Sequence, residues 1–186
     1  MEMIQANKKD LPQIMELINQ AKKFLKQQGV DQWQDGYPEV RNLEKDLQDG
    51  IGYVCKEGNR ILAYAALDFR GEPAYETLKG QWLNQDPYVV IHRMAVDSRA
   101  RGKGLAQQLF RQAEAMALAR GVQNVRADTD EANAIMRHII QKAGYTFCGH
   151  IFFANSDKIA FQKTLAGKNG PLPSTLSRKT GGNPAR

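Results

Sequence analysis

The chain has 186 residues, of which 42% are hydrophobic and 25% charged, with a formal net charge of +6 at pH 7. These values are typical of one globular domain. No stretch approaches the about 18 consecutive apolar residues that a membrane-spanning helix needs, which excludes a membrane protein. Two cysteines and three scattered histidines exclude a disulfide-rich scaffold and a zinc finger. The first residues form no basic and apolar leader, so we expect a cytoplasmic protein.

The excess positive charge lies mostly at the end of the chain. Residues 167–186 hold four of the 26 basic residues and none of the 20 acidic ones, together with four glycines and three prolines. We therefore predict a single domain over 1–166, followed by a flexible basic tail over 167–186. The nearly neutral domain gives no reason to expect binding to nucleic acid or to a membrane.

The first part of the chain predicts two helices after a short strand. The apolar run 3–6 is the predicted first strand, and apolar residues at helical spacing follow it. That helix is expected to end at Gly29. A polar and aromatic link over 31–37 comes next, and Pro38 is then expected to begin a second helix that ends at Gly50.

A hairpin and a central strand are predicted next. Two strand-like runs, 51–56 and 60–67, flank the turn sequence Glu57-Gly58-Asn59. Residues 68–87 contain several glycines and prolines, so we expect them to be irregular. The run 88–96 is almost continuously apolar, which is typical of a central strand covered on both faces.

Helices and strands alternate in the remaining part. An apolar stripe predicts a helix that begins near Leu105 and ends at Gly121. A strand at 122–128 and a helix over 132–143 follow. The final elements are the two strands of a hairpin, at 145–153 and 158–165. Helices that interleave with a mixed, mostly antiparallel sheet indicate an α+β (mixed α/β) fold.

The segment 96–106 carries the clearest chemical signal. The central strand ends at Val96, and Gly102 and Gly104 precede an amphipathic helix. Glycines let backbone N–H groups approach a phosphate closely, and a helix N-terminus favours negative charge. Three basic residues surround the glycines: Arg99, Arg101 and Lys103. The pattern is neither a Walker loop nor the dinucleotide fingerprint, which needs glycine at Gln107. It predicts a phosphate-binding loop, and the alternative is a plain turn.

Two segments together resemble the GNAT superfamily of N-acetyltransferases. The run 101–106, Arg-Gly-Lys-Gly-Leu-Ala, fits the R/Q-x-x-G-x-G/A loop at which that family binds acetyl-coenzyme A. The run 133–145 is similar to the family's N-x-x-A-x-x-x-Y-x-K-x-G-F helix. Arg99 could also begin the loop motif, but the distance from Val96 favours Arg101. The resemblance implies a GNAT-like fold, with a central sheet of about six to seven strands and about four helices.

The resemblance also implies how the coenzyme is held. The backbone of residues 94–96 would bind the pantetheine arm, the loop would bind the pyrophosphate, and Asn133 would lie near the arm. The residues implied are Met94, Ala95, Val96, Arg101, Gly102, Lys103, Gly104, Leu105, Ala106, Gln107 and Asn133. Acetyl-coenzyme A is the implied co-substrate, and the reaction requires no metal.

The chain departs from the family at its usual proton donor. A tyrosine that often protonates the departing thiolate would fall at position 140, where this chain has Ile140. An isoleucine side chain has no proton to donate. Tyr145 is a candidate acid in its place. The alternatives are Cys148, Tyr88, water, or departure of the thiolate without a proton donor.

Acetyl transfer to an amine also needs a group that removes a proton, because alkyl amines are protonated at neutral pH. His92 precedes Met94 by two residues on the central strand, and imidazole exchanges protons near neutral pH. We therefore name His92 as the candidate base. A structural or substrate-orienting role is its alternative, and Glu76 or Asp86 is the alternative base.

Aromatic residues in the link regions suggest an acceptor pocket, because aromatic rings attract cations and line small-molecule sites. The candidates are Trp33, Tyr37, Trp82 and Tyr88. The alternative role of Trp33 and Trp82 is to cover the edges of the core. Together with these residues, the resemblance implies an N-acetyltransferase that acts on a small-molecule or peptide amine by direct attack in a ternary complex. It also implies a homodimer. The alternative is a non-catalytic sensor of acyl-coenzyme A.

Overall fold

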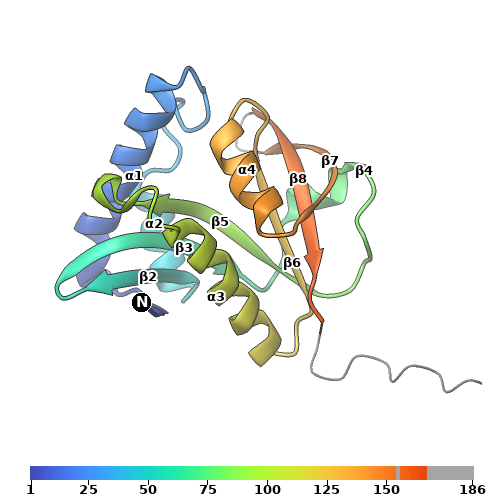
Figure 1. The fold of residues 1–186 in the computed structure, drawn as a ribbon, viewed down its shortest axis with the longest axis horizontal. Coiled ribbons are helices and arrows are strands. Elements are labelled where there is room, and N and C mark those ends of the chain that lie inside the picture. Colours follow the sequence, from blue (N-terminus) through green and yellow to red (C-terminus); the bar gives the residue numbers. More distant parts are fainter. Residues whose placement is uncertain (154–155, 167–186) are drawn as a thin grey trace, which may run out of the picture.

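The computed structural model describes residues 1–153 and 156–166, and the predicted tail lies outside the described residues. Within these ranges, one eight-stranded sheet carries helices on both faces (Figure 1). No helix in the described part of the chain is long and apolar enough to cross a membrane.

The strand order in the sheet is β1-β2-β3-β5-β6-β8-β7-β4. Neighbouring strands are antiparallel, except that β5 and β6 are parallel. The elements in chain order are β1 (Met3–Gln5), α1 (Leu11–Gln27), α2 (Val40–Gln48), β2 (Gly52–Glu57), β3 (Arg60–Asp68), β4 (Lys79–Gly80), β5 (Tyr88–Val96), α3 (Leu105–Ala119), β6 (Asn124–Asp130), α4 (Ala134–Lys142), β7 (Thr146–Phe153) and β8 (Ser156–Thr164).

The predicted fold class, α+β with a mostly antiparallel sheet, is confirmed. The eighth strand is β4, which lies in the segment 68–87 that the sequence predicts to be irregular. It has only two residues, and it approaches β7 so closely that a Cβ on Gly80 would lie 2.1 Å from the Cys148 carbonyl oxygen. The same segment also forms a short 3₁₀ helix, Pro73–Thr77. Neither element is long enough to leave a periodic pattern in the sequence.

The second helix begins at Val40 rather than at the predicted Pro38. Glu39 has an extended backbone and is the N-cap, so the residue before it cannot be helical. Its backbone N–H donates to the Asn42 side chain at 2.7 Å, which completes a capping box.

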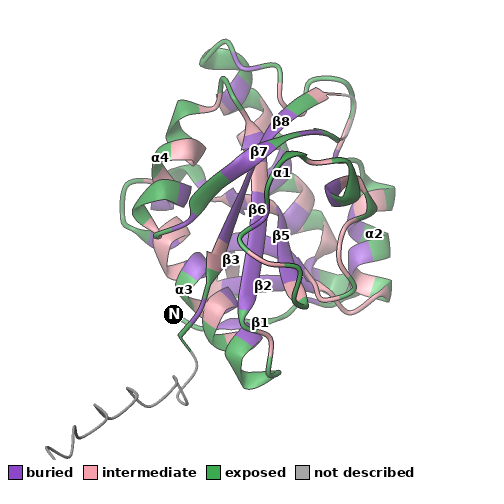
Figure 2. Cartoon of the chain, turned by 90° about the vertical axis from the view of Figure 1, so that its right-hand side faces the viewer, coloured by how far each residue is buried: buried purple, intermediate pink, exposed green. Residues whose placement is uncertain are grey.

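The helices pack on opposite faces of the sheet through separate apolar clusters. α1 and α2 pack on one face through Ile14, Ile18 and Leu43. α3 and α4 pack on the other face through residues that include Phe110 and Ile140. Figure 2 shows buried strands between helices whose outer surfaces are exposed. The sheet is therefore covered on both faces, as the apolar run of β5 predicts.

The parallel strands β5 and β6 part before either of them ends. Their pairing runs from Tyr88 opposite Asn124 to Ile91 opposite Ala127 and then stops. Beyond this point β5 remains paired with β3, through a bulge in which Arg93 has a φ of +52°. β6 remains paired with β8. The sheet therefore has two halves, one ending in β5 and the other in β6, which separate beyond this last pair.

Candidate active site

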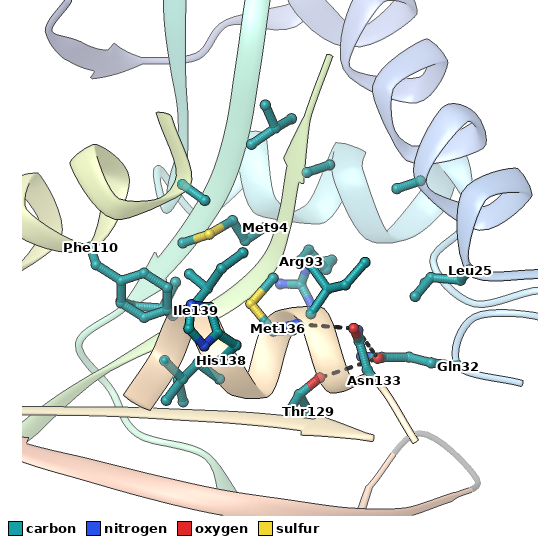
Figure 3. A pocket seen from close by; sticks show the side chains of 18 of the residues that line it. Leu25, Gln32, Arg93, Met94, Phe110, Thr129, Asn133, Met136, His138 and Ile139 are labelled. Carbon is teal, nitrogen blue, oxygen red and sulfur yellow. Dashed lines mark hydrogen bonds between the residues drawn. The ribbon is translucent and has the colours of Figure 1, made fainter. Parts of the chain in front are cut away.

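A cavity of about 500 Å³ opens where β5 and β6 part (Figure 3). Its walls come from both strands, from the end of α1 and the link between α1 and α2, from the first turns of α3, and from α4 along its length. Figure 3 shows Met94, Phe110 and Met136 among the side chains that line it. This volume is in the range that small-molecule and cofactor sites occupy.

The glycine loop forms one end of this cavity. Gly102 and Gly104 both have a φ of +76°, a left-handed backbone that glycine adopts without strain. Neither position is crowded, because a Cβ there would meet no atom within 4 Å. Gly104 is the N-cap of α3, so the N–H groups of the first helical turn point out of the helix end. The backbone therefore fits an anion such as a pyrophosphate.

Asp97 fixes the turn between β5 and this loop. Its buried carboxylate accepts hydrogen bonds from the Arg99 amide at 2.8 Å and from the Arg60 guanidinium at 2.6 Å. Burial opposes ionisation of Asp97, but these hydrogen bonds outweigh burial, so its pKa lies below the ordinary value. The sequence analysis did not identify this residue, because an aspartate before a loop is common.

Most of the predicted coenzyme-binding residues line the cavity. They are Met94, Ala95, Val96, Arg101, Gly102, Gly104, Leu105, Ala106, Gln107 and Asn133. Lys103 is exposed and does not line it. The Arg101 guanidinium lies over the Phe24 ring, 4.1 Å from its centroid, and burial lowers the pKa of Arg101. An anion beside Arg101 would offset the cost of burying this charge.

Gln32 links two walls of the cavity, and no sequence pattern indicated it. Its side-chain oxygen accepts hydrogen bonds from Asn133 Nδ2 at 2.8 Å and from Thr129 Oγ1 at 3.2 Å (Figure 3). Asn133 also caps α4, because its side-chain oxygen accepts from the Met136 amide at 3.1 Å. The predicted coenzyme contact Asn133 is thus held in one orientation.

His92 lines the cavity and is 8% exposed. Its Nε2 lies 3.4 Å from a Glu72 carboxylate oxygen, and its ring stacks on Phe153 at 5.6 Å between centroids. Burial opposes ionisation of Glu72, but hydrogen bonds from His92 and the Ala74 amide outweigh it and lower the Glu72 pKa. The ionised Glu72 carboxylate therefore lies directly beside the imidazole of His92.

The two alternative bases, Glu76 and Asp86, are not among the residues that line the cavity. Glu72 does not line it either, but it contacts His92, which does. Glu72 lies in the segment 68–87, just before its 3₁₀ helix, and the tertiary fold brings it to His92. Nothing in the sequence distinguishes it from Glu76.

The carboxylate of Asp128 on β6 lines the cavity and was not predicted. It accepts a hydrogen bond from the Tyr75 hydroxyl at 2.8 Å. Burial raises the pKa of Asp128, although His92, Tyr75 and Lys158 act in the opposite direction. Burial is therefore the larger influence on this carboxylate.

The four aromatic acceptor candidates separate into two pairs. Trp33 and Tyr37 line the cavity, and the Tyr37 hydroxyl accepts a hydrogen bond from Arg93 at 2.7 Å. Trp82 and Tyr88 do not line it. They lie on either side of the Arg126 guanidinium. Its central carbon is 3.9 Å from the centroid of the Trp82 ring and 3.8 Å from the centroid of the Tyr88 ring. For Trp82, which is buried, this placement agrees with the alternative role at the edge of the core.

Tyr145, the candidate acid, packs in the core and is not among the residues that line the cavity. Its ring meets Phe110 edge to face at 5.2 Å between centroids. Burial and the nearby Glu114 carboxylate raise the pKa of its hydroxyl well above the ordinary value. Cys148 is buried in a cluster with Trp82, and Ile140 is buried in the cavity wall.

Comparisons with solved structures give the same class of fold. An acetyltransferase of the GNAT family from Streptococcus agalactiae is 32% identical, with a TM-score of 0.81 over 89% of this chain and 95% of that one. A GNAT acetyltransferase from Listeria monocytogenes is 23% identical, with a TM-score of 0.70 over 88% and 94%. An aminoglycoside acetyltransferase solved with coenzyme A is 18% identical, with a TM-score of 0.64 over 88% and 94%.

The family model of the acetyltransferase (GNAT) family matches residues 12–145. The protein therefore belongs to the GNAT family of acetyltransferases, whose co-substrate is acetyl-coenzyme A. A search among curated proteins gave no match. The predicted family, fold class and enzyme class are confirmed.

Proposed function

We propose that the protein transfers the acetyl group of acetyl-coenzyme A to a primary amine, by direct attack in a ternary complex. One observation carries the proposal: the same cavity holds a glycine loop suited to a pyrophosphate and, where β5 and β6 part, His92, whose Nε2 lies 3.4 Å from the Glu72 carboxylate. A phosphate site and a basic group in one cavity are what amine acetylation requires.

The chain's own backbone is suited to hold the coenzyme. The loop N–H groups and Arg101 would bind the pyrophosphate. Beyond Ile91 the side of β5 that faces β6 forms no further strand pair, so its N–H and C=O groups are available to the amide groups of the arm. An N–H group there would also stabilise negative charge on the reacting carbonyl oxygen.

Acetyl-coenzyme A supplies an activated thioester, so no covalent bond to the protein is needed. His92 takes a proton from the acceptor ammonium or from the attacking amine, and Glu72 stabilises the imidazolium that forms. Ile140 provides an apolar wall at the position of the family's usual tyrosine. A thiol has an ordinary pKa of about 8.5, so the sulfur can leave as a thiolate without a donor in the cavity.

The first experiment measures the release of free coenzyme A thiol from acetyl-coenzyme A across a panel of amines. We expect Gly104→Glu to abolish coenzyme binding, because it places a negative charge and a strained φ at the phosphate loop. Gly121→Glu is the matched control, since Gly121 has a φ of +73° and equally open surroundings at the other end of α3. It should bind and turn over like the wild type.

His92→Ala should lower kcat by roughly 10²–10⁴-fold while leaving coenzyme binding intact, as expected for loss of a general base. Coenzyme binding without turnover of any amine would instead favour the sensor function. Equal coenzyme binding by wild type and Gly104→Glu would argue against the loop as the coenzyme site.

A further inference from the structure

Asp128 and His92 face each other across the point at which the sheet opens. The last parallel pair is Ile91 opposite Ala127, and His92 and Asp128 are the next residue on each strand. Successive side chains point to opposite faces of a sheet, so the two side chains share the face opposite to that of the pair before them. Both line the cavity.

The other charged groups at this end of the cavity have partners of opposite charge. Arg93 binds Asp46 through two hydrogen bonds of 2.6 and 2.7 Å. Lys158 on β8 lies 3.8 Å from Asp130. Glu72, from the segment between β3 and β5, lies beside His92.

Asp128 differs from these groups. Its one hydrogen bond to a side chain comes from the neutral Tyr75 hydroxyl, and within the described ranges it forms no ion pair with a Lys or Arg. Lys158 attracts Asp128 without forming an ion pair with it, because its ion pair is with Asp130, and Asp35 attracts it as well. A partly enclosed carboxylate without a paired cation is costly, and a cation from a ligand would remove that cost.

The reacting amine cannot serve as that cation through the whole reaction, because it becomes a neutral amide. A second ammonium group on the same acceptor keeps its charge from binding to product. The rings of Tyr37, Phe153 and Trp33 line the same cavity and favour a cation over an anion. Glu72 and Asp128 together disfavour an acceptor that carries a carboxylate.

We propose that Asp128 binds a second, non-reacting ammonium group of the acceptor, so that the enzyme prefers diamines to monoamines and amino acids. This inference rests on the proposed amine acetyltransferase function. In the complex, Asp128, oriented by the hydrogen bond from the Tyr75 hydroxyl, holds the distal ammonium on the β6 side of the gap. His92 and Glu72 act on the reacting amine on the β5 side.

The test compares acceptors that share one spacer and differ only in the end group: 1,4-diaminobutane, pentylamine and 5-aminopentanoate. Diamines with shorter and longer spacers are assayed beside them. For the wild type, we expect kcat/KM for the best diamine to exceed that for pentylamine by about tenfold or more, from a charge-assisted hydrogen bond. The aminopentanoate should be the poorest acceptor.

Asp128→Asn should remove the preference, so that kcat/KM for the diamine falls to about the value that the same variant shows for pentylamine. The asparagine retains an acceptor for the Tyr75 hydroxyl, and coenzyme-induced thermal stabilisation shows that the variant is folded. Asp86→Asn is the matched control, because Asp86 is exposed and outside the cavity, and it should leave both values unchanged.

Several results would overturn the inference. They are equal use of pentylamine and the diamine by wild type, a preference for the aminopentanoate, or an equal loss for both amines in Asp128→Asn. Turnover of other amines with no turnover of any diamine would also overturn it. Failure of the proposed function would give a different result from failure of this inference: the wild type would bind no coenzyme or turn over no amine at all.

Discussion

His92 and Tyr145 both carry side chains suited to proton transfer, but their surroundings give them different capacities. His92 lines the cavity and has the Glu72 carboxylate 3.4 Å from its Nε2. Tyr145 packs against Phe110 in the core, and its hydroxyl is buried away from the cavity lining. The residue type alone therefore does not establish a role in proton transfer, because access to the reacting atoms depends on the packing around the side chain.

Tyr145→Phe tests this distinction at one atom. We expect kcat to stay within about twofold of wild type, since the hydroxyl that is removed does not reach the cavity. The measurement is a steady-state acetylation assay. Ile140→Tyr would serve as a companion variant, because it restores the family's usual donor in the cavity wall. A loss of kcat by about a hundredfold in Tyr145→Phe, with normal coenzyme binding, would mean that the hydroxyl takes part in the reaction.

Among the elements, the loop before α3 depends on the turn that Asp97 holds. Its carboxylate joins β3, through Arg60, to the short 3₁₀ helix Ser98–Ala100 that leads to the glycines. We expect Asp97→Asn to lower the free energy of unfolding by about 2 kcal/mol at pH 7 through loss of a charge-assisted hydrogen bond. It should also weaken coenzyme binding. Urea denaturation and a coenzyme titration measure the two effects.

The effect of Asp97 on stability should depend on pH. Its folded-state pKa lies below the unfolded value of about 3.9, so its contribution is complete above that pH. The contribution is lost as the pH falls through the folded pKa. The difference in unfolding free energy between wild type and Asp97→Asn should therefore shrink below about pH 4. Asp86→Asn should follow wild type throughout, and an undiminished difference in acid would contradict the electrostatic explanation.

In the molecule as a whole, the sheet consists of two halves joined by the short parallel pairing of β5 and β6. We expect coenzyme A at about 100 times its Kd to stabilise the fold by roughly 2.7 kcal/mol, because it binds only the folded cavity. For a chain of this size, that is roughly 5–10 °C in Tm. Thermal unfolding with and without coenzyme A measures it.

Gly121→Glu should show the same rise in Tm as wild type, and Gly104→Glu should show none. No rise in wild type at saturating coenzyme would contradict the idea that the cavity is the coenzyme site. The dimer suggested by the family resemblance stays a prediction. The basic segment 167–186 lies outside the described residues.

The sequence by itself determined the features that local patterns encode. Periodic apolar residues predicted four helices and seven strands, and the glycines at 102 and 104 identified the loop, because φ near +76° leaves few other residue types. With the segment 133–145, this loop was enough to indicate the family. The sequence patterns did not predict β4, which forms by pairing with the distant strand β7. They also misplaced the start of α2, which the cap at Glu39 determines.

Only the tertiary structure decided which side chains share the cavity. It brought Glu72 and Asp128 to His92, and it placed Trp82 and Tyr88 around Arg126 instead. These outcomes depend on strand register and on contacts between residues far apart in the chain. Local periodicity carries no information about either, because it records which face a residue occupies and not what lies opposite that face.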